Sequence, residues 1–172
     1  DTGQNLRINP DTGAIADRVN SGRLPVGMAT NPQTGDVFAE VATDQTLVKF
    51  SRGVKGGKFA SLPDYPNGIA ADETAVWVLM WIGGSNAQGQ VIRYDQRSGS
   101  SSKSELLGDA VSNIGKAGNG VWVNQAKLDT THLNLLDPTS LQRMQTVTLN
   151  GFFPSLVATN KSIVMAGGRR GS

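Results

Sequence analysis

Short apolar segments alternate with turn-forming segments along the whole chain, and they recur in one order. The first segment of each repeat is small and apolar, and it covers residues 25–29, 66–70, 111–115 and 154–158. These segments start 41, 45 and 43 residues apart. Their length, and the Pro, Gly and Asn residues around them, predict short strands.

Three further strands complete each predicted repeat. The second, a Val-Trp-Val-like run, covers residues 36–39, 75–78, 120–123 and 162–165. The third covers residues 6–9, 48–51, 92–95 and 134–137, and residues typical of turns follow most of its copies. The fourth is more polar and covers residues 14–19, 58–62, 102–107 and 143–149, as expected of an outermost strand that faces water.

The period and the strand count together predict the fold class. No segment shows convincing 3.6-residue apolar spacing, so we expect an all-β chain. A period in the low forties with four short strands is typical of a β-propeller, in which each repeat forms one four-stranded blade. We therefore predict a single propeller domain over residues 1–172 with about four blades, at residues 25–65, 66–110, 111–153 and 154–172 joined with 1–24.

Two arrangements of the ring are compatible with these repeats. The chain begins before a third strand and stops after a second strand, so both ends could share one blade. That arrangement gives a closed four-bladed ring. The alternative is a partial arc of a larger propeller, whose unpaired strand edges would promote assembly.

Composition narrows the possible partners. The net charge is only +2, and the basic residues are scattered apart from Arg169 and Arg170. A nucleic-acid-binding domain normally shows a basic stripe with interleaved aromatic residues, which this chain lacks, so we do not expect nucleic-acid binding. The absence of Cys excludes disulfides and thiolate chemistry. No apolar run is long enough to span a membrane, and low charge with abundant Gly, Ser, Thr and Asn suggests a secreted or periplasmic protein.

Two motifs resemble a known repeat family. Residues 7–13, Arg-Ile-Asn-Pro-Asp-Thr-Gly, and residues 120–124, Gly-Val-Trp-Val-Asn, are similar to the turn and the second strand of YVTN and streptogramin-lyase-like propeller repeats. The resemblance covers nearly the whole chain as repeats. It implies that the first strand lines a central channel and that the Trp packs between blades.

The same resemblance implies a possible activity, which the residues do not support. Streptogramin lyases use a His and acidic residues with a magnesium ion near the channel mouth. The only His here, His132, lies at the start of a third strand, away from the predicted channel, and reads as a surface residue. No nucleophile elbow, phosphate loop or zinc motif is present, so we expect no catalytic residues.

Aspartates on the loops of one mouth offer oxygen ligands that a divalent cation could use. The aspartates concerned are Asp44, Asp64, Asp109 and Asp129. Oxygen ligands suit calcium or magnesium, but the tight spacing of a dedicated cation loop is missing. We therefore predict no cofactor and no metal site.

Residues that share a repeat position are expected to be structural. Phe38, Trp77, Trp122 and Ile163 share one position and are predicted to form the core between blades. Arg7, Lys49 and Arg93 share another position. A basic ladder of this kind could bind an anion, but the stems of these side chains are expected to lie on apolar neighbours.

Aromatic residues on the mouth loops are the best candidates for function. They are Tyr65, Trp81, Phe152 and Phe153, with Arg169 and Arg170 as a charged rim. Binding residues concentrate on loops, although these rings could equally plug the channel. The predicted function is a non-catalytic scaffold that presents this face to a protein partner or to its own copies. A metal-assisted lyase or hydrolase, and a carbohydrate-binding propeller, are the alternatives.

Overall fold

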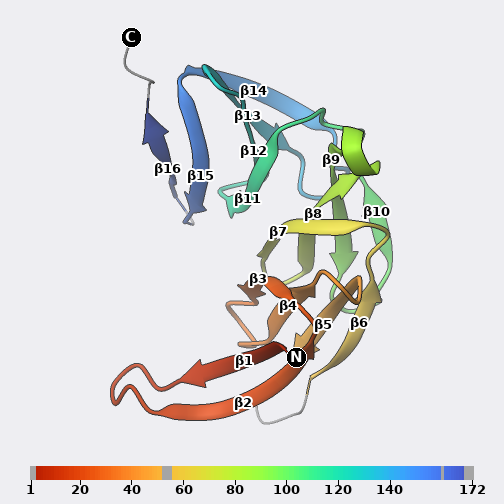
Figure 1. The fold of residues 1–172 in the computed structure, drawn as a ribbon, viewed down its shortest axis with the longest axis vertical. Coiled ribbons are helices and arrows are strands. Elements are labelled where there is room, and N and C mark those ends of the chain that lie inside the picture. The colour runs from red at the N-terminus through yellow and green to blue at the C-terminus, as the bar shows by residue number, and fades with distance from the viewer. Residues whose placement is uncertain (1–2, 52–55, 160, 169–172) are drawn as a thin grey trace.

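The computed structural model describes residues 3–51, 56–159 and 161–168, and strands dominate it (Figure 1). The N-terminal hairpin consists of β1 (Gly3–Ile8) and β2 (Ile15–Gly22). The first blade contains β3 (Pro25–Thr30), β4 (Val37–Val41), β5 (Thr46–Phe50) and β6 (Gly57–Ser61). The second contains β7 (Tyr65–Ala71), β8 (Ala75–Ile82), β9 (Gln88–Asp95) and β10 (Ser101–Lys103), with the short 3-10 helix η1 (Gly84–Asn86) between β8 and β9.

The third blade and a second hairpin follow. The third blade contains β11 (Val111–Ala117), β12 (Gly120–Ala126), β13 (Thr130–Leu136) and β14 (Arg143–Asn150). The C-terminal hairpin consists of β15 (Phe152–Ala158) and β16 (Ile163–Gly168). Each blade is an antiparallel sheet with its strands in chain order, which confirms the predicted all-β class and the four-stranded repeat.

The blades form an open arc. Figure 1 shows the N-terminal hairpin at one end and the C-terminal hairpin at the other. Each hairpin is a separate two-stranded sheet, and the two are not paired with one another among the described strands. A closed ring is therefore not shown, and the number of blades in a complete ring stays open. The predicted shared blade of residues 154–172 and 1–24 is not formed within this arc.

Turns on one side of the arc follow a repeated hydrogen-bonding pattern. Asn9, Asp95 and Asp137 each lie at or directly after the end of a third strand, and each side-chain Oδ1 accepts backbone N–H groups two and three residues further on. The Ser98 N–H lowers the pKa of Asp95, and the Ser140 N–H lowers that of Asp137. These Asx turns explain the recurring polar residue at this position.

The core lies between the blades. One cluster joins the first and second blades and includes Phe38, Leu47, Val78 and Tyr94. Another joins the second and third blades and includes Trp77, Leu79, Val123 and Leu136. Phe38 and Trp77 are 0% and 1% exposed, as predicted for the core, whereas Trp122 at the same repeat position is only half-buried because no complete blade covers it among the described residues.

Ile163 does not share that position, so this assignment was wrong by one residue. In the blades, Phe38 pairs with Ala29 and Trp77 with Ala70, and the matching pair in the C-terminal hairpin is Val164 with Val157. Ile163 therefore lies on the opposite face of β16, because neighbouring residues of a strand point to opposite faces.

Two residues of the basic ladder form ion pairs on the blades. Lys49 Nζ lies 2.8 Å from Asp36 and 5.6 Å from the centre of the Phe38 ring. Arg93 lies 3.6 Å from Asp95. Both side chains are thus occupied locally, which favours the structural interpretation of this position.

Candidate functional site

Tyr65 and Trp81 form a stacked pair at the mouth of the second blade. Tyr65 begins β7, Trp81 lies near the end of β8, and the two residues are directly opposite in the sheet. Their ring centres are 6.1 Å apart with an angle of 24° between the planes. Each side chain is 40% exposed, so the pair presents a rigid aromatic surface to solvent.

Trp81 also joins two blades. Its indole Nε1 donates a hydrogen bond of 3.1 Å to the backbone oxygen of Val111, at the start of β11. The amide Nδ2 of Asn67 donates to the same oxygen at 3.1 Å. One carbonyl of the third blade therefore holds two side chains of the second, and Trp81 is both exposed and structural.

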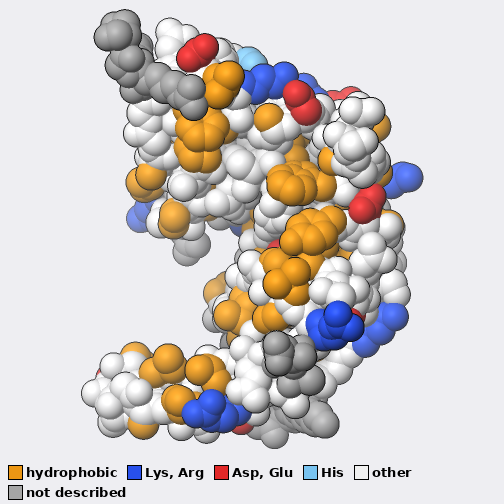
Figure 2. Space-filling view, in the orientation of Figure 1, with side chains coloured by type: hydrophobic (Ala, Val, Ile, Leu, Met, Phe, Trp, Pro, Cys, Tyr) orange, Lys and Arg blue, Asp and Glu red, His pale blue; other side chains and the backbone are white. Residues whose placement is uncertain are grey.

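A hollow adjoins this pair on the third blade. Its volume is about 830 Å³, and Ala110, Lys127, Leu128, His132 and Phe152 are among its lining residues. Leu128 is 62% exposed and Phe152 is 39% exposed. Ala110 directly precedes the carbonyl that Trp81 binds, so the aromatic pair and the hollow lie close together. Figure 2 shows hydrophobic side chains gathered over the middle of the arc on the face that it presents.

We call the exposed parts of Tyr65, Trp81, Leu128 and Phe152 the mouth face. Leu128 was missed by the sequence reasoning, because a single Leu in a polar loop gives no distinctive signal.

Phe153 serves the scaffold more than the surface. It is half-buried, its backbone N–H donates to Thr131 Oγ1 at 3.0 Å, and its carbonyl accepts from Asn124 Nδ2. These bonds fix β15 against the third blade. Arg169 and Arg170, the predicted rim, lie outside the described residues.

The mouth aspartates brace loops separately. Asp44 Oδ2 accepts the backbone N–H of Arg23 at 3.1 Å, and Asp64 Oδ2 accepts that of Gly83 at 3.2 Å. Asp109 lies 2.8 Å from Lys127 Nζ, and this hydrogen bond lowers the pKa of Asp109.

These bonds tie neighbouring mouth loops together without gathering the carboxylates at one point. Within residues 3–51, 56–159 and 161–168, no group of three or more His, Asp or Glu side chains is arranged to hold a metal ion.

His132 borders the hollow rather than lying apart from the mouth. Its Nδ1 is 3.1 Å from the hydroxyl of Thr148 on the neighbouring strand β14. Asp129 and Thr130 line the same hollow. The position differs from the expected one because β13 begins at the mouth, so a residue early in this strand stays near it.

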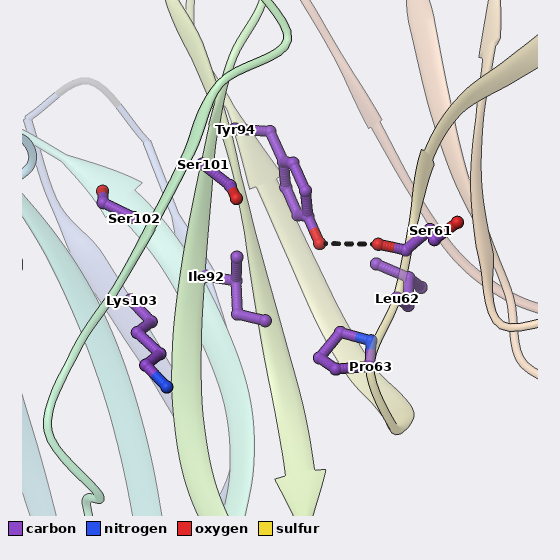
Figure 3. Close-up of a pocket in the computed structure, with 8 residues that line it drawn as sticks. All are labelled: Ser61, Leu62, Pro63, Ile92, Tyr94, Ser101, Ser102 and Lys103. Atoms are coloured by element: carbon purple, nitrogen blue, oxygen red, sulfur yellow. Dashed lines mark hydrogen bonds between the residues drawn. The ribbon is translucent and has the colours of Figure 1, made fainter.

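A second groove lies at the outer rim between the first and second blades (Figure 3). Its volume is about 500 Å³, and Leu62, Pro63 and Ile92 form much of its wall. The Tyr94 hydroxyl crosses it to donate to the Ser61 carbonyl at 3.1 Å. This contact fastens β9 of the second blade to the end of β6 in the first, and the groove brings together no recognisable catalytic set.

Glu40 is a buried acid that sequence reasoning missed. It lies on β4, is 0% exposed, and neither carboxylate oxygen makes a hydrogen bond of normal geometry with the described residues. Burial raises its pKa to about 8, although the Gly68 backbone opposes the shift.

The space for this carboxyl comes from a glycine. A Cβ at Gly27, its partner on β3, would collide with the Glu40 carboxylate. The register places Leu79 and Asn124 at the matching positions of the other blades. The signal available in the sequence was an acidic residue, Glu40, at a repeat position where the second blade has Leu79.

Comparison with known proteins identifies the fold. No protein-family model matches the chain, and no curated protein matches its sequence. Among solved structures, hydrazine synthase of Kuenenia stuttgartiensis is similar with a TM-score of 0.71 and 10% identity, over 89% of this chain and 45% of that one. Virginiamycin B lyase from Staphylococcus aureus is similar with a TM-score of 0.68 and 15% identity, over 95% of this chain and 56% of that one. Saccharomyces cerevisiae Sqt1 is similar with a TM-score of 0.69 and 12% identity, over 94% of this chain and 49% of that one.

These likenesses are in fold, because the identities are low. The chain spans about half the length of the solved structures that it resembles. In the part of the chain that the structure describes, no helix is long and apolar enough to cross a bilayer. The chain has a propeller-like fold of radial four-stranded sheets, and its predicted resemblance to streptogramin-lyase-like propellers is confirmed at the level of structure.

Proposed function

We propose that this chain is a β-propeller binding module that takes a protein partner on its mouth face. The stacked pair of Tyr65 and Trp81 carries this proposal, since it is exposed yet held in place by the bond to Val111. Rigid aromatic side chains lose little entropy on binding and are favoured anchors at protein interfaces.

The surroundings of the pair suit an interface. Leu128 and Phe152 add exposed apolar surface beside it, and the Lys127–Asp109 pair lies at the edge of the hollow. Apolar anchors with a polar rim are the usual anatomy of a protein-binding patch. The central aromatic pair would supply affinity, and the rim would tune association.

Loss of a copurifying partner on mutation of the mouth face tests the proposal. Tyr65→Ser and Leu128→Ser remove exposed apolar surface, whereas Lys58→Ser changes an exposed residue on β6, beyond the mouth face. Pull-down from the source organism's extract, with partners quantified by mass spectrometry, should lose one protein with both mouth variants and retain it with Lys58→Ser. Equal recovery with all three variants would exclude this face.

One observation favours a second candidate, a lyase or hydrolase. His132 borders the hollow with Phe152, and virginiamycin B lyase has a similar fold. A His132→Gln variant that loses a measured elimination or hydrolysis reaction, with partner binding unchanged, would support this alternative. Saturable binding of simple sugars that is lost in Tyr65→Ser would instead favour the carbohydrate-binding alternative.

A further inference from the structure

The two hairpins at the ends of the arc carry complementary halves of one blade. β15 and β16 hold the first and second strand positions, and β1 and β2 hold the third and fourth. In each complete blade the second and third strands pair antiparallel. β16 and β1 therefore each leave one edge without this pairing in the described arc. Free strand edges are templates for pairing with another chain.

The N-terminal hairpin exposes an apolar face that its counterparts bury. Leu6, Ile8 and Ile15 are 44%, 55% and 45% exposed. By the repeat alignment, Leu6 and Ile8 correspond to Ile92 and Tyr94 on β9, which are only 7% and 4% exposed. In the second blade these positions pack against the preceding blade. The hairpin has the same pattern, but this face stays exposed among the residues that the structure describes.

The other end of the arc exposes the matching surface. A groove of about 290 Å³ lies over the outer part of the third blade, and Trp122, Leu135, Met144 and Ile163 are among its lining residues. Trp122 is half-buried and Met144 is 51% exposed. The equivalent Trp77 is 1% exposed, and it packs in one buried cluster with Val123, Leu136 and Leu141 of the next blade.

The repeat also predicts one hydrogen bond across this junction. Trp77 Nε1 donates to the carbonyl of Pro138 at 3.0 Å, in the turn after the third strand of the next blade. Pro138 follows Asp137 just as Pro10 follows Asn9, and both turns have the same Asx geometry. A hairpin docked beside β16 would therefore bring the Pro10 carbonyl to the Trp122 indole.

We propose that a second copy of this chain supplies its β1–β2 hairpin to β16 and completes this blade. The pairing of Trp77 with Arg93 and of Trp122 with Leu135 sets the register and places Val164 opposite Arg7 of the other copy. Leu6 and Ile8 then cover the groove at Trp122 and Ile163.

The arc itself favours a second copy as the occupant. The chain's own hairpin lies at the opposite end of the arc from β16 (Figure 1). The arc also spans about half of the solved propellers that it resembles. Two arcs joined at both ends would close a two-fold ring. Three complete blades from each copy and two blades shared between the copies make eight, within the usual range for propellers.

Disulfide trapping tests this register directly, because the chain contains no Cys. Arg7→Cys and Val164→Cys proteins, prepared separately, should form a mixed disulfide dimer only when combined under mild oxidation. Ile163→Cys is the matched control, since its side chain lies on the opposite face of β16, and its yield with Arg7→Cys should be much lower. Cα atoms of directly opposite residues lie within disulfide reach.

Two results would overturn the proposal. One is a crosslink formed within single chains of the Arg7→Cys/Val164→Cys double variant, which would show a closed ring. The other is a monomer by sedimentation with no mixed crosslink, which would leave no role for a second copy.

A second pair of variants separates assembly from the proposed mouth function. Ile8→Asp places a charge on the docking face at a residue that the arc leaves 55% exposed, so it should abolish the dimer and retain the circular dichroism spectrum. Leu128→Asp, on the mouth face, should leave the dimer intact. A dimer that survives Ile8→Asp would contradict this junction, whatever the mouth face binds.

Discussion

The indole N–H of Trp77 donates a 3.0 Å hydrogen bond to the carbonyl of Pro138, which joins an inner strand of one blade to an outer turn of the next. Trp122 has the same repeat position but is only half-buried beside the C-terminal hairpin. The same residue type thus has two environments, decided by what the next blade provides.

This difference predicts unequal costs of truncation. Trp77→Ala should lower the free energy of unfolding by ~3–5 kcal/mol, because it removes a buried ring and its hydrogen bond. Trp122→Ala should cost only about 1–2 kcal/mol in the monomeric arc, because less apolar area is lost. Urea unfolding followed by circular dichroism measures both, and equal costs would contradict the observed difference in burial.

The carbonyl of Val111 predicts coupling between two side chains of the second blade. Either Trp81→Phe or Asn67→Ala leaves one hydrogen bond to this oxygen, so each alone should cost about 1 kcal/mol. Together they remove both side-chain hydrogen bonds to this oxygen, and the double variant should exceed the sum by roughly 1 kcal/mol. A double-mutant cycle from urea midpoints checks this, and strict additivity would show that the two bonds act independently.

Buried Glu40 predicts stability that falls as pH rises. Its folded pKa is about 8 against an ordinary value of 4.5, so the folded state binds the proton more tightly. This contribution is fully present below pH 4.5 and is lost as pH rises through 8, by on the order of 5 kcal/mol. Glu40→Gln should flatten the decline in unfolding free energy between these pH values.

Glu105→Gln is the matched control for Glu40, because this exposed acid pairs only with Arg143 at the surface. It should keep the slope of the parent protein. An unchanged slope in Glu40→Gln would show that the carboxyl is ionised and solvated in solution.

The Asx turn at Asp137 predicts a contrast between two substitutions. Asp137→Asn retains an Oδ1 that can accept the Thr139 and Ser140 N–H groups, whereas Asp137→Ala does not. The alanine variant should have the lower melting temperature at pH 7. Since the pKa of Asp137 is lowered in the folded state, the parent should lose this advantage as pH falls through that value, and the asparagine variant should not.

Much of the repeat could be predicted from sequence, because its signals are local. Three of these signals depend only on neighbours within one repeat. They are the strand periodicity, the turn residues after Asp95 and Asp137, and the recurring aromatic residue at Phe38 and Trp77. A one-residue slip occurred at Ile163 and Val164, because the run from Ile163 to Ala166 is uniformly apolar and shows no alternation.

Tertiary structure decided what depends on contacts between repeats. Four features depend on segments that are distant in sequence or that differ between repeats. They are the open arc, the half-burial of Trp122, the burial of Glu40 behind Gly27 and the hydrogen bond from Trp81 to Val111. The sequence by itself determined the strands, their order and the blade as a unit, since these follow from local backbone and side-chain preferences. Which faces and edges remain free was decided only by the packing of one blade on the next.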